Sequence, residues 1–380
     1  MYPNSRPLII APRCMLLTWE EEFKKWDVDV PFYILNNNEC SGQEDTLAVS
    51  LLKQAGNGKS FSRKRGWKNN AARGQWDSIT SSIRKSQHKL HELKALIDPF
   101  VHVHKGTILQ ERLPGLRDAL VVLKPTTTQQ KLLGKIGGTK LSLENDYMMS
   151  LVSVHPSLLS EYVTHNEGFR KVLKMFERDP RVGVKTHFLM ELIKLSGALN
   201  EKVLVFSQYI KPLGFIMELL KAKFQWVEGR ECLYMDGQQE EKHRQASINT
   251  LNDPKSEVKV LLASIRACSE GISLVGASRV VLLDVVWNPS VERQAISRAY
   301  RLGQTKLVHV YHLVTGTMEG EKYIRQIEKS HLSELVFSSK NRDNLNPKIS
   351  PTVSADKILE EMVQHEKLQH MFEKVEEGDF

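Results

Sequence analysis

The sequence has few cysteines and no long apolar segment. Its cysteines (Cys14, Cys40, Cys232 and Cys268) are far apart and form no C-x-x-C pair. This argues against a zinc site or a disulfide framework and favours a reducing compartment. No run of about 18 apolar residues is present, so we expect no membrane span. The N-terminus also lacks the basic-then-apolar pattern of a secretion signal.

Acidic residues are outnumbered by basic ones. The sequence has 53 Lys and Arg against 45 Asp and Glu, a formal net charge of +8. A positive surplus favours a polyanionic partner, most simply nucleic acid. Residues 49–76 are basic without any acidic residue and are rich in Gly, Asn and Ser. We interpret them as a solvated or disordered insert, with nucleic-acid contact through Phe61, Trp67 and Trp76 as the alternative.

Gly58-Lys59-Ser60 matches the end of a phosphate-binding loop motif but not its beginning. The motif G-x-x-x-x-G-K-[ST] needs a glycine five residues before Gly58, and Lys53 stands there. No apolar strand leads into the segment, and basic residues flank it. We therefore do not expect it to bind ATP. His102 and His104 share one face of a predicted strand, but without a third ligand nearby we predict no metal site.

Strand and helix patterns alternate regularly from Lys202 onward. Apolar, β-branched runs occupy Lys202–Ser207, Cys232–Met235, Val258–Ser264, Ser278–Val286 and Leu307–Val314. Helical stretches lie between them at Pro212–Phe224, Gln239–Asn252 and Ser290–Leu302. Strands that are apolar on both faces and alternate with helices indicate a parallel sheet covered on both sides. We predict one α/β domain over residues 184–335. A further strand is expected at Ala119–Leu123, with mixed helix from Thr126 to about Phe176.

The segment WNPSVERQAISRAYRLGQ, residues 287–304, has the strongest functional pattern. Asn288 can cap a helix that starts at Pro289. Helical spacing places Gln294, Arg298 and Arg301 on one face. Val291, Ala295, Ala299 and Leu302 form the neighbouring apolar stripe. Two arginines on one rigid face suit a phosphate chain, because each guanidinium donates a planar fork of hydrogen bonds.

This segment and those before it resemble the second RecA-like lobe of SNF2-type superfamily-2 helicases. The matching stretches are KVLVFSQ, LYMDG, HRQASINTLND and LLASIRACSEGISLVGASRVVLLDVVWNP. LIIAPRCMLLTWEEEFKKW, near the N-terminus, resembles a block of the first lobe. FVHVHKGTILQERLPGLR and VSVHPSLLS are similar to the plant CLASSY-type proteins of this family. The resemblance implies a RecA-like parallel sheet with helices on both faces.

The resemblance also implies roles for individual residues. Arg298 and Arg301 would be catalytic arginine fingers that reach ATP held on the first lobe. Further implied contacts are Gln294, Gly271 and Glu270 to the nucleotide, and Pro12, Trp19, Ser264 and Trp287 to nucleic acid. ATP and Mg²⁺ are the family's cofactors. The sequence departs from the family at Ser297, usually Asp, and at Tyr300, usually His.

Two first-lobe motifs of the family are missing from the sequence. It contains no complete Walker A loop and no Asp-Glu dipeptide to hold Mg²⁺. We therefore predict that the chain does not hydrolyse ATP alone, and that the first lobe is truncated. The implied function is nuclear: an SNF2-type DNA translocase in RNA-directed DNA methylation and small-RNA silencing. Its implied partners are DNA, chromatin and silencing-complex proteins such as a plant-specific RNA polymerase, with no membrane.

Two alternatives to a motor remain open. One is a non-catalytic adaptor that docks on a nuclear silencing complex. The other is the C-terminal lobe of an RNA helicase, which fits less well because the segment from Trp287 to Gln304 resembles SNF2 proteins more than DEAD-box ones. Residues 1–45 form a remnant of the first lobe, 46–80 the basic insert, 81–183 an inter-lobe helical region and 184–335 the helicase C-terminal lobe. Residues 336–380 form a tail with a last amphipathic helix, capped by Ser354 and packed through Ile358, Met362 and Leu368.

Overall fold

A computed structural model describes residues 93–95, 113–137, 143–163, 166–267, 271–337 and 356–378. The chain divides into two units, 1–97 and 98–380, and the fold described below belongs to the second. The predictions for residues 1–92, for the histidine pair at 102 and 104, and for Ser354 lie outside the described residues. Among the helices that are described, none is both long enough and apolar enough to span a membrane.

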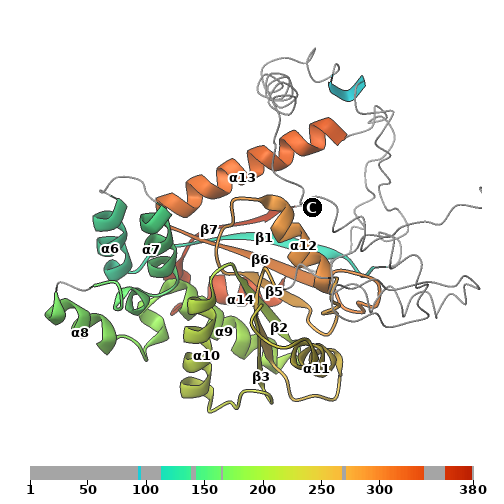
Figure 1. The fold of residues 1–380 in the computed structure, drawn as a ribbon, viewed down its shortest axis with the longest axis horizontal. Helices are drawn as coiled ribbons and strands as arrows, with labels where there is room; N and C mark the ends of the chain where they lie inside the picture. The colour runs from blue at the N-terminus through green and yellow to red at the C-terminus, as the bar shows by residue number, and fades with distance from the viewer. Residues whose placement is uncertain are drawn as a thin grey trace, which may run out of the picture. The chain divides into compact units, whose positions relative to one another are not determined.

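A seven-stranded sheet organises the second unit (Figure 1). Its spatial order is β3-β4-β2-β5-β6-β1-β7, and all neighbours are parallel except β7, which runs antiparallel to β1. The strands are β1 Leu116–Leu123, β2 Val203–Ser207, β3 Cys232–Met235, β4 Val260–Ser264, β5 Arg279–Leu282, β6 Val308–Thr315 and β7 Phe372–Gly378. The predicted fold class, a mostly parallel α/β sheet, is confirmed.

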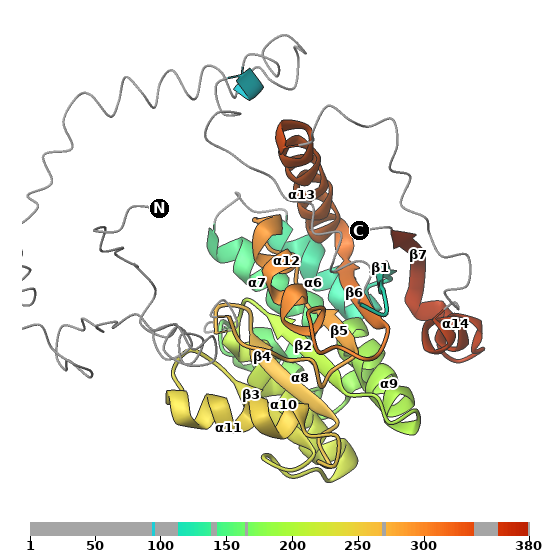
Figure 2. The same ribbon diagram turned by 90° about the vertical axis from the view of Figure 1, so that its right-hand side faces the viewer.

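Helices cover both faces of the sheet (Figures 1 and 2). One face carries α9 Val184–Ala198, α10 Ile210–Phe224 and α14 Lys357–Gln364. The other carries α11 Glu241–Asn252 and α12 Pro289–Ala299, with α13 Gly316–Phe337 against β6 and α12. A smaller layer contains α6 Thr127–Gly137, α7 Leu143–Val154 and α8 Glu167–Met175. This arrangement follows from the apolar character of both sides of each inner strand.

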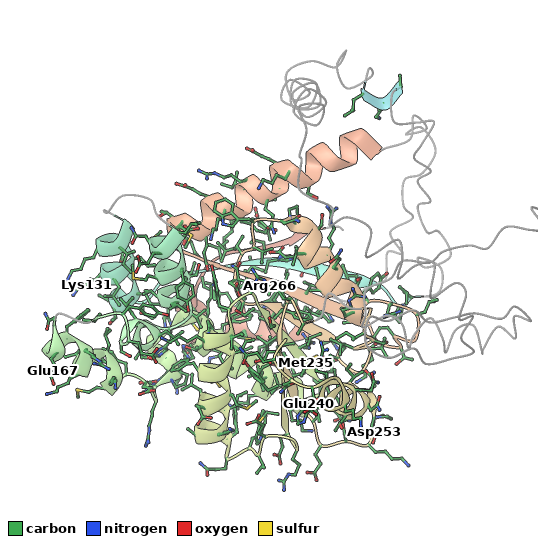
Figure 3. All side chains as sticks on the ribbon, in the orientation of Figure 1. Lys131, Glu167, Met235, Glu240, Asp253 and Arg266 are labelled. Atoms are coloured by element: carbon green, nitrogen blue, oxygen red, sulfur yellow. The ribbon has the colours of Figure 1, made fainter. Side chains whose placement is uncertain are left out.

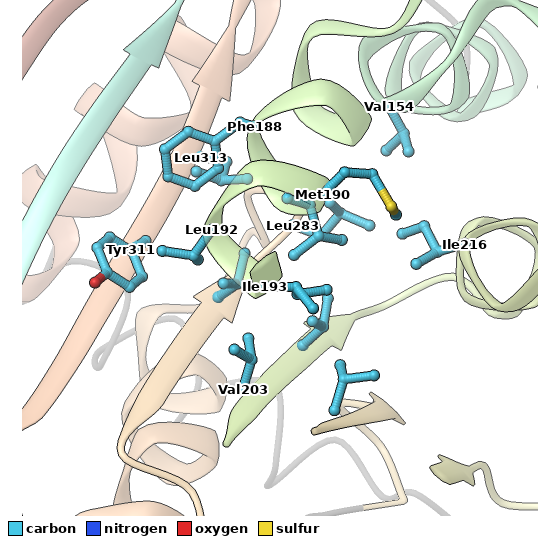
Figure 4. Close-up of a cluster of buried hydrophobic side chains, with 14 of the residues drawn as sticks. Val154, Phe188, Met190, Leu192, Ile193, Val203, Ile216, Leu283, Tyr311 and Leu313 are labelled. Carbon is cyan, nitrogen blue, oxygen red and sulfur yellow. The ribbon is translucent and has the colours of Figure 1, made fainter. Parts of the chain in front are cut away.

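Alternate strand residues feed two separate cores. Val203, Val205 and Leu313 point to the α9 face, where Phe188 and Ile193 meet them (Figure 4). The intervening residues, such as those at 204, 206 and 310, join the core beneath α11 and α12. Every residue of β2, β4 and β5 is buried. The period-two alternation therefore fixes which helix each strand residue contacts.

The sheet extends beyond the predicted range 184–335 on one side. Strand β1 pairs with β6 in parallel, and β7 from the tail pairs with β1. Strands β2, β3 and β4 lie within two residues of their predicted positions, whereas β7 was not predicted. Its apolar residues Phe372 and Val375 are three apart in the sequence, and the ladder shifts register between Val122 and Leu123. This irregularity hides the strand period.

The last helix differs from its prediction at both ends. It starts at Lys357, and its cap is Asp356, whose side chain accepts a hydrogen bond from the Ile358 amide. Ser354 was predicted as the cap. The helix ends at Gln364, so Leu368 lies beyond it, although Leu368 is still buried with Ile358 and Met362 in the α9-face core. Asp356, two residues closer to the apolar residues, is the cap instead.

Candidate functional site

Helix α12 begins as its sequence predicts. The Asn288 side chain accepts a hydrogen bond from the Ser290 amide (3.1 Å), and Pro289 occupies the first turn. The cap has an extended backbone, and the proline removes an amide that would otherwise be unpaired there. These two residues therefore fix the start of the helix at Pro289.

The end of α12 differs from its prediction. The helix stops at Ala299 rather than Leu302, with Tyr300 as its C-cap. Arg301 therefore follows the helix instead of completing a face with Gln294 and Arg298, and Leu302 is 57% exposed instead of buried. Gly303 has a φ of +101°, a left-handed conformation that turns the chain away after the helix. Ile296, which is not part of the predicted apolar stripe, is buried in the core beneath α11 and α12.

The loop of residues 271–277 is tied to this end of α12. The Leu274 amide donates to the Arg298 carbonyl (2.8 Å), and Nη1 of Arg301 donates to the carbonyls of Gly271 and Ile272 (3.0 Å each). The buried Gln304 amide donates to three further carbonyls, those of Val275, Ala277 and Ala299. The structure thus brings together Arg298, Arg301 and Gly271 from the predicted nucleotide set.

A close approach of backbones explains Gly276 in this loop. A Cβ atom there would lie 2.2 Å from the Leu251 carbonyl oxygen, so any larger residue would displace α11 or the loop. The Asn252 side chain also binds the loop: it accepts from the Gly276 amide and donates to the Ser273 carbonyl (2.8 Å each). The loop is therefore held between the ends of α11 and α12.

The outer surface of α12 is polar. Gln294 and Ser297 are exposed, and Arg298 is half-buried. The Ser297 hydroxyl donates to the Gln294 carbonyl (2.7 Å), so the residue that replaces the family's usual Asp bonds within its own helix. Gln294 thus shares the helix with Arg298, one turn apart.

Two of the four predicted nucleic-acid residues, Ser264 and Trp287, lie at or after the carboxyl ends of β4 and β5. Ser264 ends β4 and is buried, whereas Arg266, two residues later, is exposed (Figure 3). Trp287 follows β5 and is 43% exposed. In parallel sheets ligands bind outside the carboxyl ends of the strands. Arg266 was missed from the sequence, although a basic residue directly after a parallel strand is a usable signal.

Lysines of α13 flank the Trp287 ring. Nζ of Lys322 lies 4.9 Å and Nζ of Lys329 lies 5.6 Å from the ring centroid. Nζ of Lys329 also donates to the Trp287 carbonyl (3.1 Å), and Lys322 pairs with Asp146 of α7 (3.0 Å). The lysine ammonium groups favour the ring's negative face. An exposed indole with an exposed lysine beside it can contact nucleic acid.

Buried charged residues hold the segments that follow β2 and β5 in place. Lys185 of α9 is fully buried, pairs with Glu319 of α13 (2.7 Å) and donates to the Leu283 carbonyl (2.6 Å). Asp284 accepts from the Gln208 amide (3.1 Å to the nearer oxygen), and burial raises the pKa of its carboxyl. These contacts fix the exits of β2 and β5 relative to α9 and α13.

Three residues predicted for the site cannot be placed. Pro12 and Trp19 belong to the N-terminal part of the chain, and Glu270 to a short segment before Gly271, all outside the described residues.

Comparison with known proteins assigns the fold just described to a family. The helicase conserved C-terminal domain matches residues 184–303. The SNF2 domain-containing protein CLASSY 3 of Arabidopsis thaliana is 39% identical over 509 residues, covering 98% of this chain and 36% of the relative. CLASSY 4 of the same plant is 39% identical over 483 residues, covering 98% and 43%. The solved C-terminal part of the Fun30 ATPase domain is 19% identical, with a TM-score of 0.44, covering 59% of this chain and 97% of that structure.

The chain therefore carries a helicase C-terminal domain, and its parallel sheet with helix α12 belongs to that domain. Within that class it belongs to the SNF2 type and is similar to the CLASSY proteins. The chain spans less than half the length of these relatives.

Proposed function

We propose that this chain provides the second lobe of an SNF2-type DNA translocase that acts on chromatin in the nucleus. The observation that carries the proposal is the arrangement at α12. One helix presents Gln294 and Arg298, while Arg301 is anchored on the Gly271 loop directly beyond it. Guanidinium groups so close together suit the phosphates of a nucleotide bound on a first lobe.

Nucleic acid would lie along the carboxyl edge of the sheet. Trp287 offers an exposed ring for stacking, and Arg266 offers an exposed cation near the end of β4. Phosphate neutralisation and stacking on aromatic rings are the general means of binding nucleic-acid strands. A role in RNA-directed DNA methylation, with silencing-complex partners, rests on the similarity to CLASSY proteins.

The chain alone should not turn over ATP. Arginine fingers accelerate phosphoryl transfer by about 10³–10⁵, but only when the nucleotide and its metal are in place. When bound, ATP and Mg²⁺ would supply the reacting phosphate and its charge neutralisation. This chain would contribute Arg298, Arg301, Gln294 and Gly271, but no Asp-Glu pair for the metal.

A difference in length within the aligned region supports the expectation that the chain alone does not hydrolyse ATP. The alignment with CLASSY 3 runs over 509 residues, and this chain has 380, so at least 129 residues of CLASSY 3 within that span have no counterpart here. The same difference favours the adaptor as a second candidate, because an adaptor needs the second-lobe surface but no complete ATPase site.

The test is DNA-stimulated ATP hydrolysis by the purified chain beside an Arg298→Ala/Arg301→Ala double variant. We expect no turnover above the double variant, and equal behaviour supports a lobe that needs a complete first lobe from elsewhere. Turnover that the double variant abolishes would contradict this proposal, because the chain would then contain its own nucleotide site.

A further inference from the structure

His312 lies between two carboxylates from different elements. It belongs to β6, Asp118 to β1 and Glu292 to the first turn of α12, and all three are about 5% exposed. Nε2 of His312 is 2.7 Å from Asp118 Oδ1, and Nδ1 is 3.6 Å from Glu292 Oε2. The Tyr323 ring of α13 faces the imidazole at 5.9 Å between centroids. We call Asp118, Glu292 and His312 the His312 cluster.

The imidazole of this cluster is positively charged at neutral pH. Burial alone would lower its pKa, but the adjacent carboxylates of Asp118 and Glu292 raise the pKa to about 9. Two carboxylates without this cation would be buried uncompensated, which is costly. Tyr323, the remaining titratable group against the ring, is itself kept neutral because burial and the two carboxylates raise its pKa.

Glu292 connects the His312 cluster to the segment that follows β5. Its second oxygen, Oε1, accepts a hydrogen bond from the Val286 amide (3.2 Å). Val286 directly precedes Trp287, and Glu292 stands one turn into α12. A single buried carboxylate therefore binds the segment that presents Trp287 and the helix that carries Arg298.

We propose that His312 is a positioning residue for Trp287, acting through Glu292 on the Val286–Trp287 segment. Asp118 completes the support, so β1 and β6 are needed to hold an element of the helicase C-terminal domain although both lie outside residues 184–303. The positioning role itself does not depend on the proposed function. Only its expected consequence does, namely weaker DNA binding when the Val286–Trp287 segment shifts.

The direct test is the indole N–H signal of Trp287 in NMR spectra of the whole chain. The sequence has six tryptophans, and a Trp287→Phe variant assigns the signal. His312→Gln, which cannot hold a positive charge between the carboxylates, should move that signal. His309→Gln is the matched control, because His309 is a buried histidine of the same strand whose ring lies 3.6 Å from Asp356 on the other face of the sheet. It should leave the signal in place.

DNA affinity, measured by fluorescence anisotropy, gives the second readout. We expect His312→Gln to weaken binding roughly tenfold, about 1.4 kcal/mol. In a Trp287→Ala background it should add nothing, because the effect passes through Trp287. If His312→Gln does not fold, Asp118→Asn, which keeps the pair of His312 and Glu292, should give a smaller change in the same direction.

The outcomes separate the two proposals. An unmoved Trp287 signal in folded His312→Gln protein would overturn the positioning role. An equal loss of affinity in the wild-type and Trp287→Ala backgrounds would overturn it too. If His312→Gln moves the Trp287 signal but Trp287→Ala leaves the DNA affinity unchanged, the positioning role is upheld. The proposal that nucleic acid binds along the carboxyl edge of the sheet is then refuted.

Discussion

His309 and His312 lie three residues apart on β6, yet their pKa values shift in opposite directions. His309 faces the α9 side, with Nδ1 3.6 Å from Asp356, and burial lowers its pKa. His312 faces the α12 side, where two carboxylates raise its pKa to about 9 despite burial. The odd spacing sends their side chains to opposite faces of the sheet.

The two pKa values shift in opposite directions because a different residue supplies the positive charge in each place. Near His309, Arg279 already pairs with Asp356 (2.9 Å) and Glu201 (2.5 Å), and Tyr311 donates a hydrogen bond to Asp356. A second cation would be repelled there. In the His312 cluster the imidazole is the only positive group that the described contacts place between the carboxylates. We call the first set, Arg279, Glu201, Asp356, His309 and Tyr311, the Arg279 cluster.

The two clusters have different structural tasks. Asp356 caps α14, so the Arg279 cluster fastens the C-terminal segment to the sheet. The His312 cluster instead fastens α12 and the exit of β5. One face of the lobe therefore holds the tail, and the other supports the candidate functional surface.

Removing the cation of the Arg279 cluster should have the largest effect on stability. Arg279→Met leaves Asp356 and Glu201 buried or half-buried without their partner, and breaking a buried pair in this way costs about 3–5 kcal/mol. Urea unfolding should show this loss. A change below about 1 kcal/mol would mean that the cluster is not needed to hold the tail.

Stability should fall at both ends of the pH range, for opposite reasons. The folded pKa of His312 lies above the ordinary value of about 6.5, so its contribution is complete below that pH and is lost as pH rises through about 9. This amounts to roughly 3 kcal/mol. His309 has a lowered pKa, so its share is lost as pH falls below about 6.5. Unfolding measured from pH 5 to 10 should show both limbs.

Variants assign the two limbs. His312→Gln should flatten the alkaline limb and leave the acid limb. His309→Gln should leave the alkaline limb and reduce the acid limb in part, because burial also lowers the pKa values of His155 and His187. An alkaline limb that persists in His312→Gln would show that other groups cause it.

A smaller effect is expected from Asp118→Asn. The substitution keeps the shape of the side chain but removes one of the two carboxylates that raise the His312 pKa. The pKa of His312 should fall, while Glu292 still pairs with the ring. NMR titration of the imidazole measures this directly, and an unchanged pKa would show that Asp118 does not contribute.

The smallest effect is expected at the surface pair between β1 and β7. Arg117 and Glu377 lie 2.9 Å apart, and Glu377 is half exposed. Exposed pairs contribute about 0–1 kcal/mol, so Arg117→Met should change the unfolding free energy by less than that. A loss comparable to that of Arg279→Met would remove the distinction between buried and exposed charges.

The sequence pattern predicts most of the second lobe because its inner strands are apolar on both faces. Cys232–Met235 was predicted with its bounds, and the exits that carry Ser264 and Trp287 follow from the strands. The pattern cannot predict the partners of a strand, so the pairing of β1 with β6 was unforeseen. Strand β7 is charged, edge-located and irregular in register, and it therefore lacks an apolar period.

The candidate site was predictable only where local rules decide it. The Asn288 cap and the buried position of Ala295 follow from nearest-neighbour patterns. The end of α12 and the role of Gln304 depend on carbonyls of the 271–277 loop, which are distant in sequence. The His312 cluster unites β1, α12 and β6, so no local pattern could have indicated it.

The most direct test of the account is the affinity of the chain for a short single-stranded DNA at low salt. Trp287→Ala should weaken binding roughly tenfold, since base stacking contributes about 1–3 kcal/mol. Trp226→Ala is the control, because Trp226 follows α10 and stacks on Phe224 (4.7 Å) away from α12. It should bind like the wild type. Equal affinity of the Trp287→Ala variant and the wild-type chain would contradict the nucleic-acid edge.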